Sequence, residues 1–275
     1  ARRLAAELAE NAKPENARYR YDYYTDNCST RVRDALDRTL HGALKRQLSG
    51  RSGGDTYRSE SVRLASPATW MWIGFDIGLG PFGDRPLSRW EQAFLPRRLA
   101  DDLRETRLAD GRPLVVAEQE LLPQAQAAEP AERQRSLLPW LLLGIAVAVA
   151  VLALAPRMPR GVAGFAFAYW LACGLLGLVL ALGWAFTEHR ALWANRNLLL
   201  FDPLCLLLLP GAWGVLRGRA PSARFRGLLV AVATIAAFAV VPLWLQTLPQ
   251  RNGHWIALLL PIHAAFAWAW AKRKA

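Results

Sequence analysis

The chain has 275 residues, of which 53% are hydrophobic, and a formal net charge of +12. The charges are unevenly distributed, because residues 1–136 hold 22 Lys/Arg and 20 Asp/Glu whereas residues 137–275 hold 12 and 2. Basic residues between apolar runs are typical of loops beside membrane spans, and the first half has no basic stripe with interleaved aromatic residues, so a nucleic-acid partner is excluded.

The first part of the chain predicts a short helix, a strand and a loop. Residues 1–12 have the pattern of an amphipathic helix. Tyr19, Tyr21 and Tyr23 then alternate along the chain, as they would in a strand with one packed face. Residues 49–61 are rich in Gly and Ser, which predicts a loop.

Cys28 follows a helix-capping pair, Asp26 and Asn27, and a helical pattern continues from it to about residue 40. This position is the first turn of the helix, where the helix dipole and the nearby Arg31 and Arg33 favour a thiolate. A thiolate at a strand-to-helix junction is how papain-like nucleophiles are presented. The alternative is a small buried residue in an ordinary first turn, and both interpretations stay open at this point.

Cysteine usage adds weight to the first of these interpretations. Cys173 and Cys205 lie inside apolar runs, so the three cysteines form no disulfide framework. Cys28 is then a lone free cysteine in the polar half of the chain. If that half faces an oxidising compartment, a free thiol there needs a chemical reason.

The remainder of the first half predicts a helical domain that ends in a linker. Residues 67–79 are apolar and aromatic but too short to span a bilayer, so they form either a buried helix or a surface that dips toward lipid. A turn at 80–86 is followed by a helix over 89–108, capped by Ser88 and interrupted or kinked at Pro96. Further predicted segments are a short strand at 113–117 and a polar linker at 123–136.

Five apolar stretches follow the linker, at about 137–155, 161–186, 198–216, 227–248 and 255–271. Each is about long enough to cross a hydrocarbon core of ~30 Å, and tryptophans cluster near their ends. Nine basic residues flank one side of these spans and five flank the other, which places the nine in the cytoplasm. The first half, the loop 187–197 and the loop 249–254 then share the outer side. The nine are Arg157, Arg160, Arg217, Arg219, Arg224, Arg226, Lys272, Arg273 and Lys274.

A cysteine nucleophile needs a base, normally histidine. His41 is the one histidine of the first half, and along an unbroken helix it would lie ~20 Å from Cys28, too far to act. His189 and His254 share the predicted outer side with Cys28, and His189 is a candidate base. His263 lies within the last span and is interpreted as a buried packing residue.

The run around His189 is the most polar of the second half. An acid within an apolar run is costly in lipid, which makes Asp202 a functional candidate. The equally weighted alternative is an ordinary polar loop in which Asp202 pairs with a neighbouring arginine. On the functional interpretation, the polar residues of this region would bind a phospholipid headgroup or a lipidated peptide. The candidate binding residues are Glu188, Asn195, Arg196, Asn197 and Asp202. Asp76 and Asp84 are interpreted as turn residues rather than as a carboxylate pair.

Three motifs resemble one bacterial family. They are Y-x-Y-x-Y-x-x-D-N-C-S-T-R-x-R-D at 19–34, G-F-D-I-G-L-G-P-F-G-D-R-P at 74–86 and F-L-P-R-R-L at 94–99. They look like the periplasmic domain of the lipoprotein N-acyltransferase Lnb and its relatives, which are similar to papain-like, NlpC-type thiol enzymes. The resemblance covers about residues 1–122. The run N-R-N-L-L-L-F-D-P-L at 195–204 resembles the membrane part of such proteins, with less specificity.

The resemblance implies a role for Cys28. In the family the cysteine takes an acyl chain from a phospholipid as a thioester and passes it to the N-terminal amine of a lipoprotein. Carried over, Cys28 is the nucleophile, and Asn27 caps the helix and supports an oxyanion. The relatives supply their histidine from a strand upstream of the cysteine, and no such run precedes Tyr19, so the catalytic histidine is expected upstream of Ala1.

These observations combine into one expected architecture. A partial α/β papain-like periplasmic domain (1–122) is joined by a linker (123–136) to five transmembrane helices (137–275) in a mainly α protein of the bacterial inner membrane. The expected partners are a phospholipid acyl donor, a lipoprotein acceptor and the membrane, with no cofactor and no metal. Two alternatives stay open: a thiol peptidase or amidase acting on cell-wall peptide, and a non-enzymatic membrane protein in which Cys28 is structural.

Overall fold

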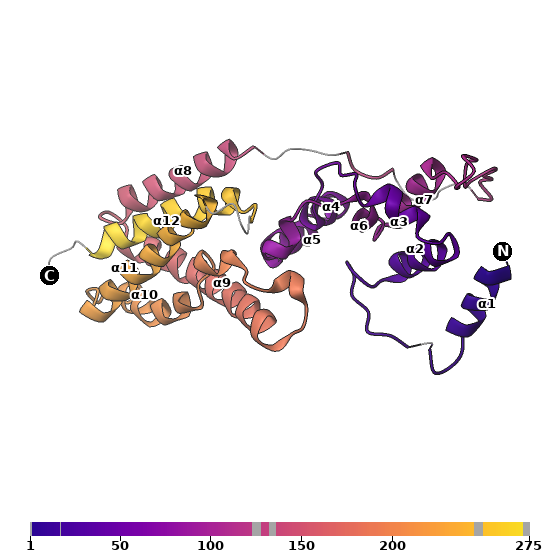
Figure 1. Ribbon diagram of the computed structural model, residues 1–275. Coiled ribbons are helices and arrows are strands. Elements are labelled where there is room, and N and C mark those ends of the chain that lie inside the picture. The colour runs from indigo at the N-terminus through magenta and orange to yellow at the C-terminus, as the bar shows by residue number, and fades with distance from the viewer. Residues whose placement is uncertain (1, 17, 123–127, 132–135, 245–249, 272–275) are drawn as a thin grey trace. The chain divides into compact units, whose positions relative to one another are not determined.

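A computed structural model describes residues 2–16, 18–122, 128–131, 136–244 and 250–271 (Figure 1). The chain divides into two compact units. We call residues 1–61 and 85–130 the N-terminal unit, and residues 62–84 and 131–275 the C-terminal unit. The segment 62–84, which the sequence analysis places in the first domain, therefore packs with the C-terminal helices.

The N-terminal unit is built from short helices around a small apolar core. The helices are α1 (Arg2–Asn11), α2 (Cys28–Thr39), α3 (Ala43–Leu48), the start of α4 (Tyr57–Ala65), α6 (Arg89–Gln92) and α7 (Pro96–Glu105). Leu44, Leu48, Ala93 and Leu99 form the core. A second cluster consists of three aromatic rings, those of Tyr24, Tyr57 and Phe94, with centroids 4.4 to 5.4 Å apart.

The predicted strand at 19–23 is wrong. Asp22 and Asp26 form an isolated antiparallel bridge, and the Asp22 carboxylate accepts the N–H groups of Tyr24 and Thr25 at 2.9 and 2.8 Å. An aspartate that bonds the backbone two and three residues ahead stabilises a turn in competition with a strand. The turn buries Tyr24, while Tyr19 and Tyr21 stay exposed.

The other extended prediction is also wrong. Residues 113–117 form no strand, and the only pairing there is the bridge between Arg107 and Pro113. In the described residues, β-pairing is confined to three isolated bridges, so the α/β part of the expected fold is not seen. The predicted loop 49–61 ends early because α4 begins at Tyr57.

The helix-capping predictions are confirmed. Asn27 caps α2 through a capping box with Thr30, and Ser88 caps α6 through a capping box with Glu91. Of the two alternatives predicted at Pro96, the structure shows the interruption: α6 ends before it, and Pro96 begins α7. Proline is favourable there because a backbone N–H in the first turn has no acceptor within the helix, so a residue without an N–H loses no hydrogen bond.

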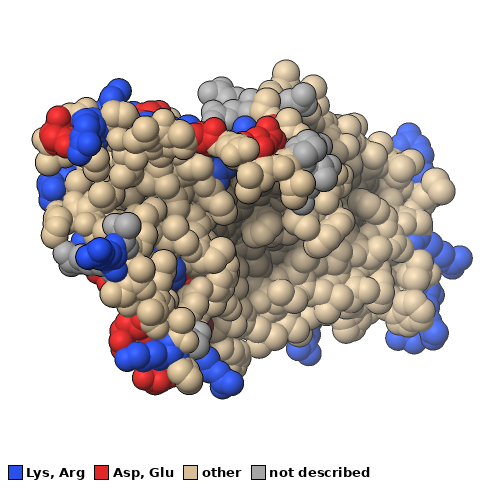
Figure 2. Space-filling view, turned by 90° about the vertical axis from the view of Figure 1, so that its right-hand side faces the viewer, with Lys and Arg blue, Asp and Glu red and all other residues tan. Residues whose placement is uncertain are grey.

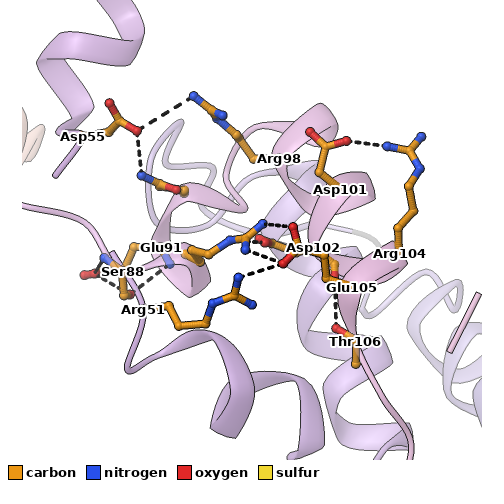
Figure 3. A network of polar contacts seen from close by, with 12 residues as sticks. Arg51, Asp55, Ser88, Glu91, Arg98, Asp101, Asp102, Arg104, Glu105 and Thr106 are labelled. Carbon is orange, nitrogen blue, oxygen red and sulfur yellow. Dashed lines mark hydrogen bonds and ion pairs between the residues drawn. The ribbon is translucent and has the colours of Figure 1, made fainter. Parts of the chain in front are cut away.

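A network of charged residues fastens α6 to α7 (Figure 3). Arg89 contacts Asp102 at 2.6 Å and donates to Glu105, which also accepts from Arg51 at 2.7 Å. The hydrogen bonds from Arg89 and Arg51 lower the pKa of Glu105 to about 2. Asp102 is buried, and burial raises its pKa to about 6 in spite of Arg89. Arg89 thus lowers the pKa of both acids, and the net shift of Asp102 is upward because the effect of its burial is larger.

Asp102 gives α7 a defined pH dependence. Because its folded pKa is raised above the unfolded value, its contribution to stability is full below about pH 4 and is lost as the pH rises through about 6. A shift of about two units corresponds to at most about 3 kcal/mol. We expect hydrogen exchange of α7, corrected for intrinsic rates, to show falling protection from pH 4 to pH 7. Asp102→Asn should remove this slope, and an unchanged slope in the variant would assign it to another group.

The C-terminal unit contains long apolar helices. They are α8 (Leu138–Leu154), α9 (Pro159–Phe186), α10 (Leu209–Leu216), α11 (Ala223–Phe238) and α12 (Gly253–Ala271). Short 3-10 turns connect them: η2 (Arg190–Leu192), η3 (Arg196–Leu199), η4 (Pro203–Leu208) and η5 (Val241–Trp244). Before them in the chain come α5 (Thr69–Gly78) and η1 (Pro81–Asp84).

Three segments among the described residues are long and apolar enough to cross a membrane, namely α9, Ala223–Trp244 and α12. The pair Arg190–Leu199 and Pro203–Leu216, bent by 41°, makes a fourth if it counts as one span, and α8 is a shorter apolar helix. The predicted stretch 198–216 is thus broken into short helices, with Pro203 and Pro210 in it. The end of the predicted stretch 227–248 lies outside the described residues.

Close helix contacts hold this unit together. A Cβ on Gly177 of α9 would overlap the Phe201 carbonyl oxygen, and one on Gly144 of α8 would lie 2.6 Å from the Ala257 carbonyl oxygen of α12. Small residues of this kind let helices approach closely in membranes, where apolar burial supplies little driving force. The fully buried rings of Trp170, Phe266 and Trp270 pack against one another with centroids 5.0 to 6.0 Å apart.

The basic connections at one end of these helices lie together. The Arg160 guanidinium is 3.0 Å from the position of a Cβ on Gly218, so the α8–α9 and α10–α11 connections are adjacent. Figure 2 shows a wide area of surface without charged side chains that ends in a group of lysine and arginine side chains. This pattern is typical of lipid-facing helices with a basic flank.

Candidate functional site

Cys28 is the first residue of α2, and its side chain is exposed. Asn27, only 6% exposed, holds this helix start in place. Its side-chain oxygen accepts the Thr30 N–H at 2.9 Å, and its amide nitrogen donates to the carbonyls of Tyr23 at 3.0 Å and Phe94 at 2.9 Å. The residue before the cysteine therefore connects α2 both to the preceding turn and to the segment after α6.

Two further bonds fix the first turns of α2 against the same segment. The Ser29 hydroxyl donates to the Ala93 carbonyl at 2.7 Å, and Arg33 donates to the Trp90 carbonyl at 2.7 Å. Within the described part of the chain, the backbone N–H groups of Cys28 and Ser29 donate to no acceptor. They are the free donors of a helix N-terminus, which favour negative charge beside the thiol.

The expected support of a thiolate by Arg31 and Arg33 needs correction. Arg31 forms a two-point ion pair with Asp26, and Arg33 is buried, pairs with Asp34 at 2.7 Å and stacks on the Trp90 ring. Each arginine thus has its own carboxylate, so its charge is largely compensated. The local field at Cys28 comes from the helix end rather than from free cations.

The cap of α2 leads to a test. Asn27→Ala removes the capping bond, worth about 1–2 kcal/mol, together with two buried donor bonds of about 1 kcal/mol each. We expect faster hydrogen exchange in the first turns of α2 and a weaker Cys28-dependent activity. Ser88→Ala is the matched control, because it removes an equivalent capping box at α6 and should leave Cys28 activity within about twofold. Equal activity losses in the two variants would contradict a specific role for Asn27.

The four histidines of the sequence lie in different surroundings. His41 ends the α2 region with a left-handed φ of 53° and is exposed. His189 and Glu188 are exposed in the turn after α9. His263 is buried, 3.0 Å from the Leu200 carbonyl, as its interpretation as a packing residue predicted.

His254 forms a buried pair that the sequence analysis did not predict. Its Nε2 lies 2.5 Å from the Asp76 carboxylate, which also accepts the Trp255 indole N–H at 3.2 Å. Asp76 is 3% and His254 is 7% exposed. Asp76 is therefore not a turn residue but the buried anchor of α5. An acid in the middle of an otherwise apolar run was the available signal for this.

Asn195 and Asn197, two of the predicted substrate-binding residues, cap the end of α5. Asn195 donates to the carbonyls of Ile77 and Gly78, both at 2.8 Å, and Asn197 donates to that of Ile77 at 2.9 Å. The last carbonyls of a helix have no partner within it, so buried side-chain amides satisfy them here. Both asparagines are buried in these bonds.

Side chains from the 250–252 loop complete this arrangement. Gln250 donates to the Asn195 side chain at 3.0 Å and accepts the Arg196 N–H at 2.8 Å, and Asn252 donates to the Asn197 side chain at 2.9 Å. We call these four amide residues the α5 clamp: Asn195, Asn197, Gln250 and Asn252. Sequence reasoning missed Gln250 and Asn252, since no local pattern distinguishes a buried amide from an exposed one.

Asp202 caps η4 by accepting the Leu204 N–H at 2.9 Å. In the part of the chain that the structure describes, it makes no ion pair with Arg190 or Arg196. Arg196 instead approaches the Pro242 carbonyl at 3.5 Å. The described residues also contain no group of three or more His, Cys, Asp or Glu side chains arranged to hold a metal ion.

Comparisons with known families match two separate parts of the chain. Residues 135–275 match the model described as the Lnb transmembrane domain, and residues 1–65 match the Lnb N-terminal periplasmic domain. No curated protein and no solved structure matches the chain. The first match alone spans more than half of the residues. The chain therefore belongs to the Lnb family of membrane proteins, whose N-terminal domain is periplasmic.

Proposed function

We propose that this protein is an acyltransferase that forms a thioester on Cys28 from a phospholipid and passes the acyl chain to the N-terminal amine of a lipoprotein. The observation that carries the proposal is the exposed Cys28 thiol at the capped start of α2, in a family whose members join this domain to a membrane domain. We further infer a location in the bacterial inner membrane with a cytoplasmic C-terminus, from the basic flanks.

The first half-reaction loads the cysteine. The Cys28 sulfur attacks the carbonyl carbon of a phospholipid ester, the ester C–O bond breaks, and the lysophospholipid leaves as an alcohol after taking up a proton. Negative charge develops on the carbonyl oxygen during the attack. The free N–H groups of Cys28 and Ser29 are donors of the kind that stabilise such an oxyanion, and Asn27 holds the turn that presents them.

The second half-reaction releases the chain. The lipoprotein amine attacks the thioester carbonyl, a C–N bond forms, the C–S bond breaks, and the amine loses a proton, which regenerates the Cys28 thiolate. Both steps need a proton acceptor. His189 remains a predicted base. Glu188, Arg196 and Asp202 remain predicted headgroup-binding residues.

The loading step can be tested directly. The full-length protein is incubated with a phospholipid that carries a radiolabelled acyl chain, and protein-bound label is counted before and after neutral hydroxylamine, which cleaves thioesters. We expect hydroxylamine-sensitive label on the wild type and none on Cys28→Ala. Cys173→Ala is the matched control, because this cysteine is buried among apolar helices. Absence of label from the wild type, with cleavage of cell-wall peptides, would favour the thiol peptidase.

A further inference from the structure

Helix α5 presents an apolar face to its surroundings. Trp70 is 74% and Met71 36% exposed, and Gly74 lies on the same exposed side. Residues 64–75 contain no charged side chain. A tryptophan exposed to this extent, with no charge near it in the chain, is unusual on a surface that meets only water.

The helix is held rigidly on the C-terminal unit. The α5 clamp binds its last carbonyls, and the Asp76–His254 pair fixes its buried side. Its ten residues span only about 15 Å, so it cannot cross a bilayer. The exposed face is therefore fixed in one orientation and cannot turn inward to bury itself.

That face continues into the lipid-facing surface of the membrane helices. Trp72 of α5 meets Trp140 of α8 with ring centroids 6.4 Å apart. In the turns around Trp140, the side chains of Leu138 and Leu142 are exposed. Just after the end of α5, the Gly80 N–H donates to the Ala191 carbonyl at 2.7 Å, in the connection that follows α9. Exposed aromatic side chains gather around this connection: Trp184, Phe186 and Trp193.

We propose that α5 is an interfacial helix whose Trp70 and Met71 insert among the headgroups and upper acyl chains of the outer membrane leaflet. A short helix with an apolar face lies in the plane of the interface with that face buried by about 5–10 Å. Tryptophan is favourable at this depth because its ring is apolar and its N–H finds polar partners. The continuity with α8 favours lipid over a protein partner, and the proposal does not depend on the chemistry of Cys28.

Depth-dependent quenching tests the proposal. In a Cys28→Ala background, Trp70→Cys is labelled with an environment-sensitive fluorophore, and the full-length protein is reconstituted into phosphatidylethanolamine–phosphatidylglycerol vesicles. Vesicles carry a doxyl quencher at acyl position 5 or 12. We expect at least threefold stronger quenching at residue 70 than at Ala220, an exposed residue of the basic α10–α11 connection, with the shallow quencher more effective than the deep one.

Two further labelled variants serve as controls. Val149→Cys, on the exposed middle of α8, should be quenched most by the deep quencher. Met71→Cys repeats the measurement on the same face of α5, in case substitution of Trp70 disturbs the helix. Quenching at residues 70 and 71 no stronger than at 220, while residue 149 is quenched normally, would overturn the proposal, whether water or protein covers the face.

Discussion

Cys28→Ser is expected to lower acyl transfer by at least about 1,000-fold. The substitution keeps the size of the side chain and its place at the capped helix start, so folding should be unchanged. A serine hydroxyl is far less acidic than a thiol, and a helix end alone cannot ionise it near neutral pH. Single removal of a nucleophile commonly costs as much as removal of the whole catalytic set. Transfer of labelled acyl chain to a lipoprotein-derived peptide measures the effect.

A control on the same helix separates chemistry from stability. Val32→Ser alters an exposed residue one turn after Cys28 and should leave the rate within about twofold. If Cys28→Ser kept more than a tenth of the wild-type rate, Cys28 would not be the nucleophile. If lipoprotein acylation in cells were the same with Cys28→Ala, the cysteine would be structural and the non-enzymatic interpretation would stand.

Local signals predicted the start of α2 correctly. The cap of Asn27 is made by bonds within four residues of the chain, so the residue type just before the helical pattern was enough to predict it. The alternation of Tyr19, Tyr21 and Tyr23 is a weaker signal, because whether it forms a strand depends on the rest of the chain. A strand needs a partner, and the Asp22 side chain made a turn more favourable than an unpaired extended segment.

The sequence also predicted the membrane helices, but it did not predict which segments contact one another. Apolar runs identify helices because lipid leaves the backbone no other partners. Where α5 lies depends on residues more than a hundred positions later, such as Asn195, and on His254, which is 178 residues from Asp76. The hydrophobic periodicity of a sequence does not indicate which distant residues form such pairs. The sequence alone therefore gives no reason to pack residues 62–84 with the C-terminal helices or to pair Asp76 with His254.

The Asp76–His254 pair should account for much of the stability of α5. Asp76→Ala leaves the His254 ring and the Trp255 indole N–H buried without their acceptor. Leaving a buried polar group without its hydrogen-bond partner costs about 1–3 kcal/mol, and two such groups are affected here. We expect α5 to lose hydrogen-exchange protection by at least a hundredfold in reconstituted protein, while α2, in the other unit, exchanges as in the wild type.

A graded series distinguishes this pair from simple packing. Asp76→Asn keeps the shape and one acceptor oxygen, so its cost should be smaller, about 1–3 kcal/mol. Asp76→Ala combined with His254→Ala should cost less than the sum of the two single changes, because contacting residues are coupled by about 0.5–3 kcal/mol. Additive losses would mean that each side chain stabilises α5 separately. Asn195→Ala, which removes two bonds of the α5 clamp, is the comparison: if it released α5 more fully than Asp76→Ala, the clamp would be the main attachment.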